Sequence, residues 1–511
     1  MSDWTSGYVA DIGYTYGYYN ELNPLRVRLA FLSAGIACPD ICVACELGYG
    51  QGISANIHAA SSGVLWYGTD FNPAQAAFAR DTAQACGAGA TLLDQSFAEF
   101  CVRDDLPDFD YIGLHGIWSW ISADNQKIIV DFLRRKLKVG GVLYISYNTL
   151  PGLASMVPIR HLLTQHVDVM AAPGRGIVSR IDAALEFTSR FLDINPRYRN
   201  ANPQIVERIK GLVSQNKHYL AHEYFNRDWT PFHFADMAEC LSVAKLSFAC
   251  SAHYLDHVDA LNLSPEQQAF LAEIPDPMFR ESVRDFIVNQ PFRRDYWVKG
   301  RRSLSSIEQV EALRAQKIML ATPRSRVTLK VNGAVGEATL QDSLYGPLLD
   351  MLSDHKPCTV GQLEKSLAPQ GISLLPLMQS LLVLAGKGDV VAVQDDGRAS
   401  KARHQTAKLN QYLMQKARGG GEISFLASSL SGGGVAVGRF SQLFLAAIAQ
   451  GRKNPHEWAD CVWQLLKAQG QALVKDGQTL VGDAENLSEL RTQAVEFGEI
   501  YLPALRALGV I

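Results

Sequence analysis

The sequence predicts an α/β protein built on a doubly wound, Rossmann-like sheet, with helix-rich units following it. Strands and helices alternate over the first 150 residues, and the first strand is an uninterrupted apolar run. A glycine-rich turn, Glu46–Gly52, follows that strand directly. A strand buried on both faces of a parallel sheet is apolar throughout, and such sheets bind ligands beyond their carboxyl ends. We therefore expect a ligand site at the strand ends.

The elements of this sheet follow one another at short, regular intervals. A helix is expected over residues 24–37, where apolar residues recur with a helical period before Pro39. Five strands are then expected at 41–47, 64–69, 90–93, 109–114 and 141–147, and the helices between them at 52–60, 73–86, 97–102 and 124–137. Because connections of this kind are right-handed, all five strands belong in one sheet.

A helical insertion follows this core. Pro151-Gly152 breaks the alternation, so we place the core at 1–152 and read residues 153–228 as largely helical. A helix at 236–246, a strand at 247–252 and the triplet Tyr296-Trp297-Val298 then complete the same sheet. The basic stretch that begins at Lys299 indicates a boundary near residue 302.

Two further units are expected behind that boundary. Residues 303–400 suggest a winged-helix-like domain, with three short helices at 344–352, 359–367 and 375–385 and a strand at 390–393. Residues 401–511 suggest a helical C-terminal domain, in which the triple glycines 419–421 and 432–434 form loops.

The composition is that of an ordinary globular protein. Hydrophobic residues make up 47% and charged residues 19% of the 511, and the net charge of −3 gives no footprint for nucleic acid or an anionic membrane. The chain has no run of about 18 apolar residues, and its nine cysteines are an odd, scattered set that indicates reduced thiols. We expect a soluble, cytoplasmic protein.

The glycine-rich turn discriminates between cofactors. Gly48, Gly50 and Gly52 give the spacing G-x-G-x-G, which lets backbone approach a ligand closely. A dinucleotide fingerprint needs a third glycine at position 53, where the chain has Ile53. A phosphate loop needs Gly-Lys-Ser/Thr, which is absent here. The turn therefore suits neither ligand.

Polar residues at the next strand ends suit a nucleoside. Asp70, followed by Phe71, is our ribose ligand, because its two oxygens can accept both hydroxyls. Asp94, with Ser96 and Phe97, offers a carboxylate to an exocyclic amine and a ring to an adenine face. His115 ends the fourth strand, near the place expected for a sulfonium. Together these features indicate S-adenosyl-L-methionine (AdoMet) and a methyltransferase.

The same segments resemble known families. Glu46–Gly52, Asp70, Asp94 and Leu137–Leu143 resemble the motifs of class I methyltransferases. Three further segments, 11–24 (DIGYTYGYYNELNP), 146–152 (SYNTLPG) and 218–226 (HYLAHEYFN), resemble bacterial methyltransferases with a predicted regulatory domain, which include rickettsial-type protein-lysine methyltransferases. The resemblance implies AdoMet as cofactor, held by Glu46, Gly48, Tyr49, Gly50 and Gly52. It also implies a regulatory or middle region within 153–302.

The acceptor is expected to be a protein lysine amine. Its ammonium must lose a proton first, and burial among aromatic rings favours that loss. Our hypothesis is that Tyr14, Tyr16, Tyr18 and Tyr147-Asn148 line the acceptor pocket. Glu223 and Tyr224 could approach it, although a structural role is at least as well founded. The reaction requires no metal.

Three alternatives remain beside this reading. A small molecule or glycan methylated at oxygen would use His115 as a base. A non-catalytic AdoMet-binding regulator would use the winged-helix-like unit to contact DNA or a partner. Cys38, Cys42 and Cys45 have the spacing of a radical-AdoMet iron–sulfur site, but the last two fall within the first strand, whereas cluster ligands need a loop.

Overall fold

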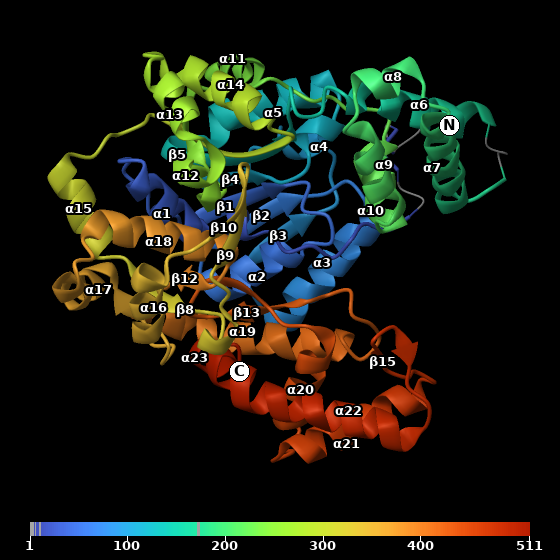
Figure 1. Ribbon diagram of the computed structural model, residues 1–511, viewed down its shortest axis with the longest axis vertical. Coiled ribbons are helices and arrows are strands. Elements are labelled where there is room, and N and C mark those ends of the chain that lie inside the picture. Colours follow the sequence, from blue (N-terminus) through green and yellow to red (C-terminus); the bar gives the residue numbers. More distant parts are fainter. Residues whose placement is uncertain (1–4, 6, 10–11, 171–173) are drawn as a thin grey trace.

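The computed structural model describes residues 5, 7–9, 12–170 and 174–511, and its centre is a seven-stranded sheet (Figure 1). The strand order is β3-β2-β1-β4-β5-β7-β6. The strands are β1 (Val43–Leu47), β2 (Leu65–Thr69), β3 (Ala90–Leu93), β4 (Phe109–Leu114), β5 (Leu137–Asn148), β6 (Leu246–Ser251) and β7 (Phe292–Lys299). The first five are parallel, and β7 runs antiparallel to both β5 and β6. The predicted sheet, with two late strands completing it, is confirmed.

Helices cover both faces of the parallel part, as apolar strands require. They are α1 (Pro24–Ser33), α2 (Ile53–Ser62), α3 (Pro73–Cys86), α4 (Phe97–Phe100) and α5 (Ala123–Lys136). Local capping fixes where they begin. The side chain of Asn72, for example, accepts the backbone N–H of Ala74 at 3.0 Å, with Pro73 at the first helical position. The helix expected to reach residue 37 ends at Ser33, because Gly35 turns the chain at φ +68°.

The insertion and the middle region flank the sheet. The insertion, green at the upper right of Figure 1, comprises α6 (Met156–Met170), α7 (Ile177–Asp193), α8 (Arg197–Ala201), α9 (Ile205–Val213) and α10 (Lys217–Tyr224). The middle region adds α11 (Phe234–Ser242), α12 (Asp259–Asn262), α13 (Pro265–Ala272) and α14 (Pro277–Val288). The helix expected at 236–246 stops at Ser242, since Lys245 at φ +59° turns the chain into β6.

The next unit has four α-helices, a three-stranded antiparallel sheet of order β11-β8-β12 and a two-stranded sheet of β9 and β10. Its elements are α15 (Ser306–Arg314), β8 (Lys317–Leu320), β9 (Lys330–Gly333), β10 (Gly336–Thr339), α16 (Asp342–Met351), β11 (Cys358–Thr359), α17 (Val360–Leu367), α18 (Leu374–Lys387) and β12 (Val390–Ala392). The three predicted helices correspond to α16, α17 and α18, and the predicted strand to β12. Its kinship to winged-helix domains stays a prediction, as do the domain boundaries.

The C-terminal region is mainly helical, orange to red at the bottom of Figure 1. It contains α19 (Asp396–Lys416), β13 (Phe425–Ser428), β14 (Gly433–Ala436), α20 (Arg439–Ala449), α21 (Pro455–Ala468), β15 (Val474–Lys475), β16 (Gln478–Thr479), α22 (Asp483–Glu496) and α23 (Leu502–Ala507). Gly433 and Gly434, expected in a loop, belong to β14.

This C-terminal region packs directly on the core. The amide of Gln394 donates to the carbonyl of Ser61 at 2.7 Å, and the hydroxyl of Thr406 donates to the carbonyl of Ala60 at 3.1 Å. Both carbonyls belong to the last turn of α2, where they accept no hydrogen bond from within the helix. These polar contacts therefore fix α19, and the segment just before it, against the end of α2.

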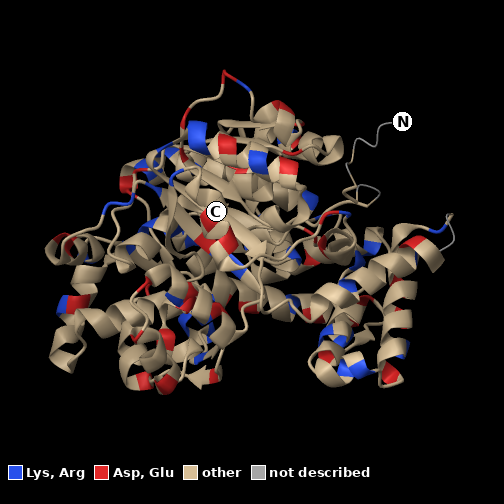
Figure 2. Ribbon diagram, turned by 90° about the horizontal axis from the view of Figure 1, so that it is seen from above, with Lys and Arg blue, Asp and Glu red and all other residues tan. Residues whose placement is uncertain are grey.

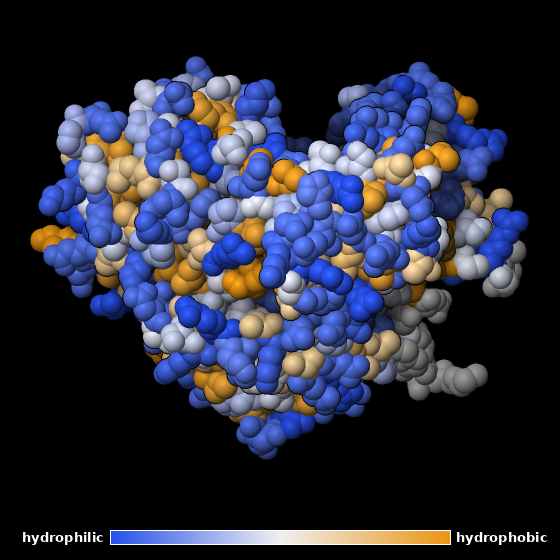
Figure 3. All heavy atoms as spheres, turned by 90° about the horizontal axis from the view of Figure 1, so that it is seen from below, coloured by the Kyte–Doolittle hydropathy of each residue, from blue (hydrophilic) through white to orange (hydrophobic). Residues whose placement is uncertain are grey.

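In the views of Figures 2 and 3, neither charged residues of one sign nor apolar residues gather in one large patch. Lys and Arg residues are interspersed with Asp and Glu along the ribbon (Figure 2). Apolar side chains lie in small separate groups on the face shown in Figure 3, which is hollowed between two lobes at one edge. Among the described residues, no single helix has the length and apolarity to cross a membrane; α17 and α18 reach that threshold only as a pair bent by 120°.

The cysteine spacing has a structural explanation. β1 begins at Val43, so Cys42 lies just before the strand and is exposed, while Cys45 is buried within it. All nine cysteines are free thiols. Burial raises the pKa of Cys45 well above its usual value, which keeps this thiol protonated.

Candidate functional site

The glycine turn leaves β1 in three left-handed steps. Gly48, Gly50 and Gly52 have φ values of +73°, +58° and +68°, a region in which side chains are strained. Space is equally restricted, because a Cβ on Gly48 would lie 2.3 Å from the side chain of Ile117. The Gly48 N–H donates to the carbonyl of Thr69 at 2.8 Å, which ties the turn to the end of β2.

Asp70 follows β2 and is held against this turn. Its carboxylate accepts the backbone N–H of Gly50 at 2.9 Å and that of Asn72 at 3.0 Å. The residue is 8% exposed, and burial raises its pKa to about 6 despite these two hydrogen bonds. Each oxygen keeps a second lone pair, so the carboxylate can still accept two hydroxyls.

Glu46 lies one strand away and has no counterion among the described residues. Its side chain is buried, and its Oε2 has no hydrogen-bond partner among the residues that the structure describes. Burial, and then the charge of Asp70, raise its pKa to about 8. A buried carboxyl group without a partner is costly. It is therefore an open position for a cationic group, such as the ammonium of a methionine moiety.

Some of the remaining cofactor candidates have side chains that a ligand can reach, whereas others stabilise the surrounding structure. The hydroxyl of Tyr49 donates to the carbonyl of Leu93 at 2.8 Å, so this side chain braces β3. Asp94 is exposed beside Arg80 at 3.5 Å. Ser96 caps α4 in a capping box with Glu99, and Phe97 opens that helix half-buried. Phe71 lies beside Asp70 and meets the ring of Tyr8 edge-on, with centroids 5.5 Å apart.

His115 directly follows β4, and its imidazole is neutral. Its Nδ1 is 2.7 Å from the hydroxyl of Tyr144, and its ring stacks on that of Tyr19 with centroids 3.6 Å apart. Burial lowers its pKa to about 4. The imidazole therefore stays uncharged at neutral pH and accepts protons weakly.

The N-terminal segment runs between the glycine turn and α10. On the α10 side, Val9 donates its backbone N–H to the side chain of Asn226 at 2.9 Å, and His222 Nε2 lies 3.0 Å from the carbonyl of Ile12. On the core side, the Tyr19 N–H donates to Ser54 Oγ at 2.9 Å. The segment is thus bound on both sides of the strand ends. Asp11, within the motif quoted above, lies outside the described residues.

Four tyrosines of this region gather over the strand ends, and we call Tyr8, Tyr14, Tyr19 and Tyr219 the tyrosine cluster. The side chains of Tyr14 and Tyr19 are hydrogen-bonded to each other. The ring of Tyr14 lies 3.4 Å from the position of a Cβ on Gly50. Tyr219 donates to the carboxylate of Glu223.

Tyr16 and Tyr18, proposed for the acceptor pocket, do not join this cluster. The ring of Tyr16 packs edge-on against Phe78 of α3, with centroids 5.0 Å apart. Tyr18 is buried against β14, where its ring lies on Gly434, and its hydroxyl is 3.1 Å from His58 Nε2. Neighbouring side chains of an extended segment point to opposite sides, so Tyr18 faces the C-terminal region while the adjacent Tyr19 faces the site.

The pair Tyr147-Asn148 is divided in the same way by β5. Tyr147 points into the core on the far face, where its hydroxyl donates to Asp295 at 2.8 Å, so the structure does not bring it to the site. Asn148 lies on the face of Ser146, whose Oγ accepts the N–H of Gly116 at 2.8 Å. The Asn148 Nδ2 is buried without a partner among the described residues, which leaves a donor available near the end of β4.

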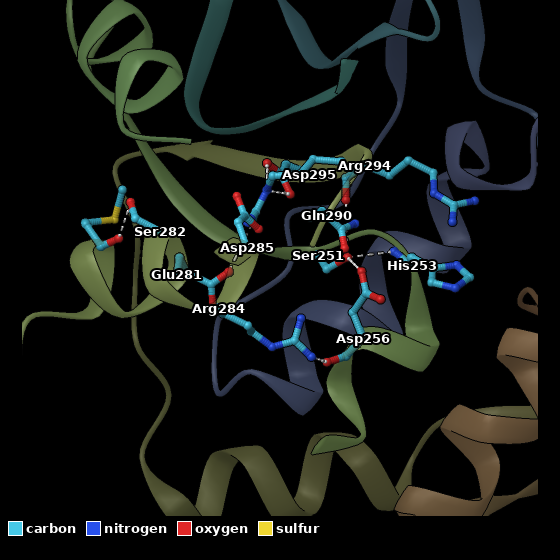
Figure 4. A network of polar contacts seen from close by, with 12 residues as sticks. Ser251, His253, Asp256, Glu281, Ser282, Arg284, Asp285, Gln290, Arg294 and Asp295 are labelled. Atoms are coloured by element: carbon cyan, nitrogen blue, oxygen red, sulfur yellow. Dashed lines mark hydrogen bonds and ion pairs between the residues drawn. The ribbon is translucent and has the colours of Figure 1, made fainter. Parts of the chain in front are cut away.

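Strand β7 connects the site to the middle region. Arg294 and Asp295 leave it on opposite sides (Figure 4). Arg294 donates to Glu21 at 2.8 Å. Burial acts to raise the pKa of Glu21, but the charges of Arg294 and Arg26 outweigh it and hold this pKa below its usual value. Glu21 is therefore a paired carboxylate, in contrast to Glu46.

The acceptor pocket predicted from the sequence did not include Tyr8, Tyr19 or Tyr219. Tyr19 could have been found, because it follows Tyr18 in the same aromatic run and only the alternation of the segment decides between them. Tyr219 lies some 200 residues further along the chain, and no local signal links it to the N-terminus.

Comparisons with known proteins agree with this architecture. Residues 216–299 match the family model described as a predicted methyltransferase regulatory domain. The protein sll1526 of Synechocystis sp. is 40% identical over 512 aligned positions, which cover 99% of each chain, and RP789 of Rickettsia prowazekii is 26% identical over 54% of this chain and 49% of its own.

A solved structure shares the whole fold. PKMT2 from Rickettsia typhi in complex with AdoHcy superposes with a TM-score of 0.70 at 17% identity, covering 97% of this chain and 99% of that one. The match extends through the sheet, the middle region and the C-terminal helices. The chain thus belongs to the family of sll1526, proteins with the class I AdoMet-dependent methyltransferase fold and a predicted methyltransferase regulatory domain.

Proposed function

We propose that this protein binds AdoMet at the ends of β1 and β2 and transfers its methyl group to a protein lysine amine. One observation carries the cofactor assignment: the buried carboxyl group of Glu46, without a partner among the described residues, lies one strand from Asp70, whose carboxylate is fixed by the Gly50 N–H. These groups match the ammonium and the ribose of AdoMet. The Rickettsia typhi relative of this fold is described with AdoHcy, the product of such a transfer.

Different residues of the site bind the cofactor, orient the acceptor and exclude water. AdoMet supplies a methyl group already activated by its sulfonium, so the protein has to bind, orient and exclude water. Gly48 and Gly50 let backbone approach the cofactor, and we assign the adenine side to Asp94 and Phe97, which follow β3. The tyrosine cluster shields the region and offers hydroxyls that orient an incoming nitrogen.

The surroundings favour an amine over a hydroxyl as acceptor. Methylation at oxygen needs a base that takes a hydroxyl proton, and His115 with a pKa of about 4 is poorly suited to it. An amine needs only to lose the proton of its ammonium, and aromatic rings beside the carboxylate of Glu223 offer a place for that cation. This contrast supports lysine as the acceptor.

The direct test is transfer of a labelled methyl group. Purified protein is incubated with methyl-labelled AdoMet and fractionated extract of its own cells, and mass spectrometry identifies the modified residue. We expect label on lysine in a protein fraction. Label in a glycan or small-molecule fraction would overturn the lysine assignment, and cofactor binding without any transfer would support a regulator.

A substitution isolates the cofactor site. Asp70→Ala removes the acceptor of two backbone N–H groups and of the ribose hydroxyls, and we expect AdoMet affinity to fall at least about 100-fold. Asp94→Ala is the matched control, since this exposed carboxylate contributes less and should cost about tenfold or less. Calorimetry measures both, and unchanged affinity for Asp70→Ala would refute the ribose assignment.

A further inference from the structure

Glu223 lies in the segment that matches the regulatory domain, yet it faces the catalytic strand ends. It belongs to the last turn of α10, and the Trp120 Nε1–H donates to its backbone carbonyl at 2.9 Å. Trp120 lies in the short helix Trp118–Trp120 that comes after β4 and His115, so this bond fixes α10 to the end of the catalytic sheet. Helix α10 is therefore placed by the core itself.

The side chain of Glu223 is surrounded by phenols. Tyr219 donates a hydrogen bond to its carboxylate, and Tyr8, Tyr14 and Tyr19 are close enough for its charge to affect them. Tyr224 of the same helix is affected in the same way. Glu223 thus borders the tyrosine cluster opposite the glycine turn.

This carboxylate has no counterion. Among the described residues, neither a lysine nor an arginine pairs with Glu223, and burial raises its pKa to about 7 against the hydrogen bond from Tyr219. Glu21, by contrast, is paired with Arg294 at 2.8 Å. A half-buried carboxylate among aromatic rings without a cation is suited to receive one.

The other titratable groups around the cluster are poor proton acceptors. Burial raises the pKa values of Tyr14 and Tyr19 above that of an ordinary phenol, so both stay protonated. Burial lowers those of His115 and His222 to about 4. Glu46 lies at the opposite side, under the glycine turn, where it suits the methionine end of the cofactor. Asp70 is held by two backbone N–H groups and Glu21 by Arg294, so among the described residues Glu223 is the carboxylate on the α10 side of the cluster that has neither kind of partner.

We propose that Glu223 binds the acceptor ammonium and takes its proton before methyl transfer, so that the regulatory domain supplies a catalytic residue. This proposal rests on the proposed function. One N–H bond of the ammonium breaks, its electron pair stays on nitrogen as the nucleophilic lone pair, and the proton forms an O–H bond with the carboxylate. Solvent removes that proton before the next cycle.

A binding experiment tests the proposal without an identified acceptor. Sinefungin is an AdoMet analogue that carries an amine on carbon in place of the sulfonium methyl, whereas AdoHcy has neither group. The ammonium of sinefungin stands where AdoMet carries its methyl group, and it therefore points to the acceptor side, on which we place Glu223. We expect Glu223→Gln to weaken sinefungin about tenfold or more and to change AdoHcy affinity less than about twofold.

Two variants complete the design. Glu223→Asp keeps a carboxylate and should retain part of the preference for sinefungin. Glu207→Gln removes an exposed carboxylate of α9, which pairs only with Lys210 in the described structure, and should leave both affinities unchanged. AdoHcy binding shows in each case that the protein is folded. An unchanged ratio of the two affinities in Glu223→Gln overturns the assignment of Glu223.

The pH dependence gives a second readout. The preference for sinefungin should rise between pH 6 and 8 as Glu223 ionises, and this rise should vanish in Glu223→Gln. Tyr8, Tyr14, Tyr19, Tyr219, Tyr224, His115 and His222 keep one protonation state over this range. Glu46, Asp70 and the exposed His218 of α10 are the same in the wild type and in Glu223→Gln, so the difference between the two proteins isolates Glu223. If the wild type does not bind AdoHcy, the proposed function itself fails; if it does and the preference is flat, only Glu223 is excluded.

Discussion

At the scale of single residues, the site is organised by carboxyl groups in different states. Glu21 is paired with Arg294, Asp70 with two backbone N–H groups, and Glu46 lacks a partner among the described residues. Their pKa values follow, from below the usual range for Glu21 to about 6 for Asp70 and about 8 for Glu46. Pairing lowers the cost of a buried charge, whereas its absence favours the protonated form.

Proton release on cofactor binding follows from Glu46. In the free protein at pH 7 a carboxyl group with a pKa of about 8 is largely protonated, and a bound ammonium favours its ionised form, so binding lowers that pKa and releases a proton. AdoHcy affinity should therefore rise from pH 6 towards 8, by up to about tenfold per pH unit, and level off above. Calorimetry in buffers of different ionisation enthalpy measures the release.

The matching variant is Glu46→Gln, which cannot ionise. It should bind AdoHcy more weakly at pH 8 and show a smaller release of protons, with only the contribution of Asp70 near pH 6 remaining. Heats that are independent of the buffer in the wild type would contradict a protonated Glu46.

At the scale of elements, α2 shows how a ligand site and helix packing constrain the same turn. Gly52 precedes the helix and Gly63 follows it, both at φ +68°. A Cβ at Gly52 would lie 2.5 Å from that of Ala79 on α3, while a Cβ at Gly63 meets nothing within 4 Å. A side chain at either glycine would therefore strain the backbone, but only a side chain at Gly52 would also clash with a neighbouring helix.

Alanine substitutions separate these two costs. Gly63→Ala should destabilise the fold by about 1 kcal/mol, the cost of a side chain in the left-handed region. Gly52→Ala adds a clash with α3 and should cost about 2–4 kcal/mol. Thermal unfolding compares them, and equal midpoints would mean that α2 and α3 can separate without loss.

At the scale of the molecule, the C-terminal region supports the N-terminal segment. Tyr18 is buried between His58 of α2 and Phe425 of β13, with ring centroids 5.3 Å and 5.0 Å away. Gly434 of β14 provides the flat surface beneath its ring. Because Tyr18 precedes Tyr19, the C-terminal region helps to set the position of the ring that stacks on His115.

This contact gives a long-range prediction. Gly434→Ala places a Cβ 2.8–2.9 Å from ring atoms of Tyr18, which should lower stability by about 1–3 kcal/mol and weaken AdoHcy binding through Tyr19. Gly397→Ala in α19 meets nothing within 4 Å and should be neutral or stabilising, since alanine favours helix. Should Gly434→Ala bind AdoHcy like the wild type, the two regions are not coupled.

The sequence by itself determined the sheet, the glycine turn and the strand-end carboxylates. These depend on local rules: apolar runs form buried strands, glycine permits positive φ, and parallel strands bring their carboxyl ends to one edge. For this reason β3, β4 and α3 have the predicted bounds, and Asp70 lies where its position after β2 requires.

Only the tertiary structure decided which residues face the side on which we propose that the acceptor binds. Tyr18 and Tyr19 are adjacent and chemically identical, and the packing of Tyr18 against Gly434 turns Tyr19 to His115. Tyr147 is removed from the site by its bond to Asp295, 148 residues away, while Tyr219 and Glu223 are brought in by α10. Side-chain direction in an extended segment depends on what each face packs against, and those partners are distant in sequence.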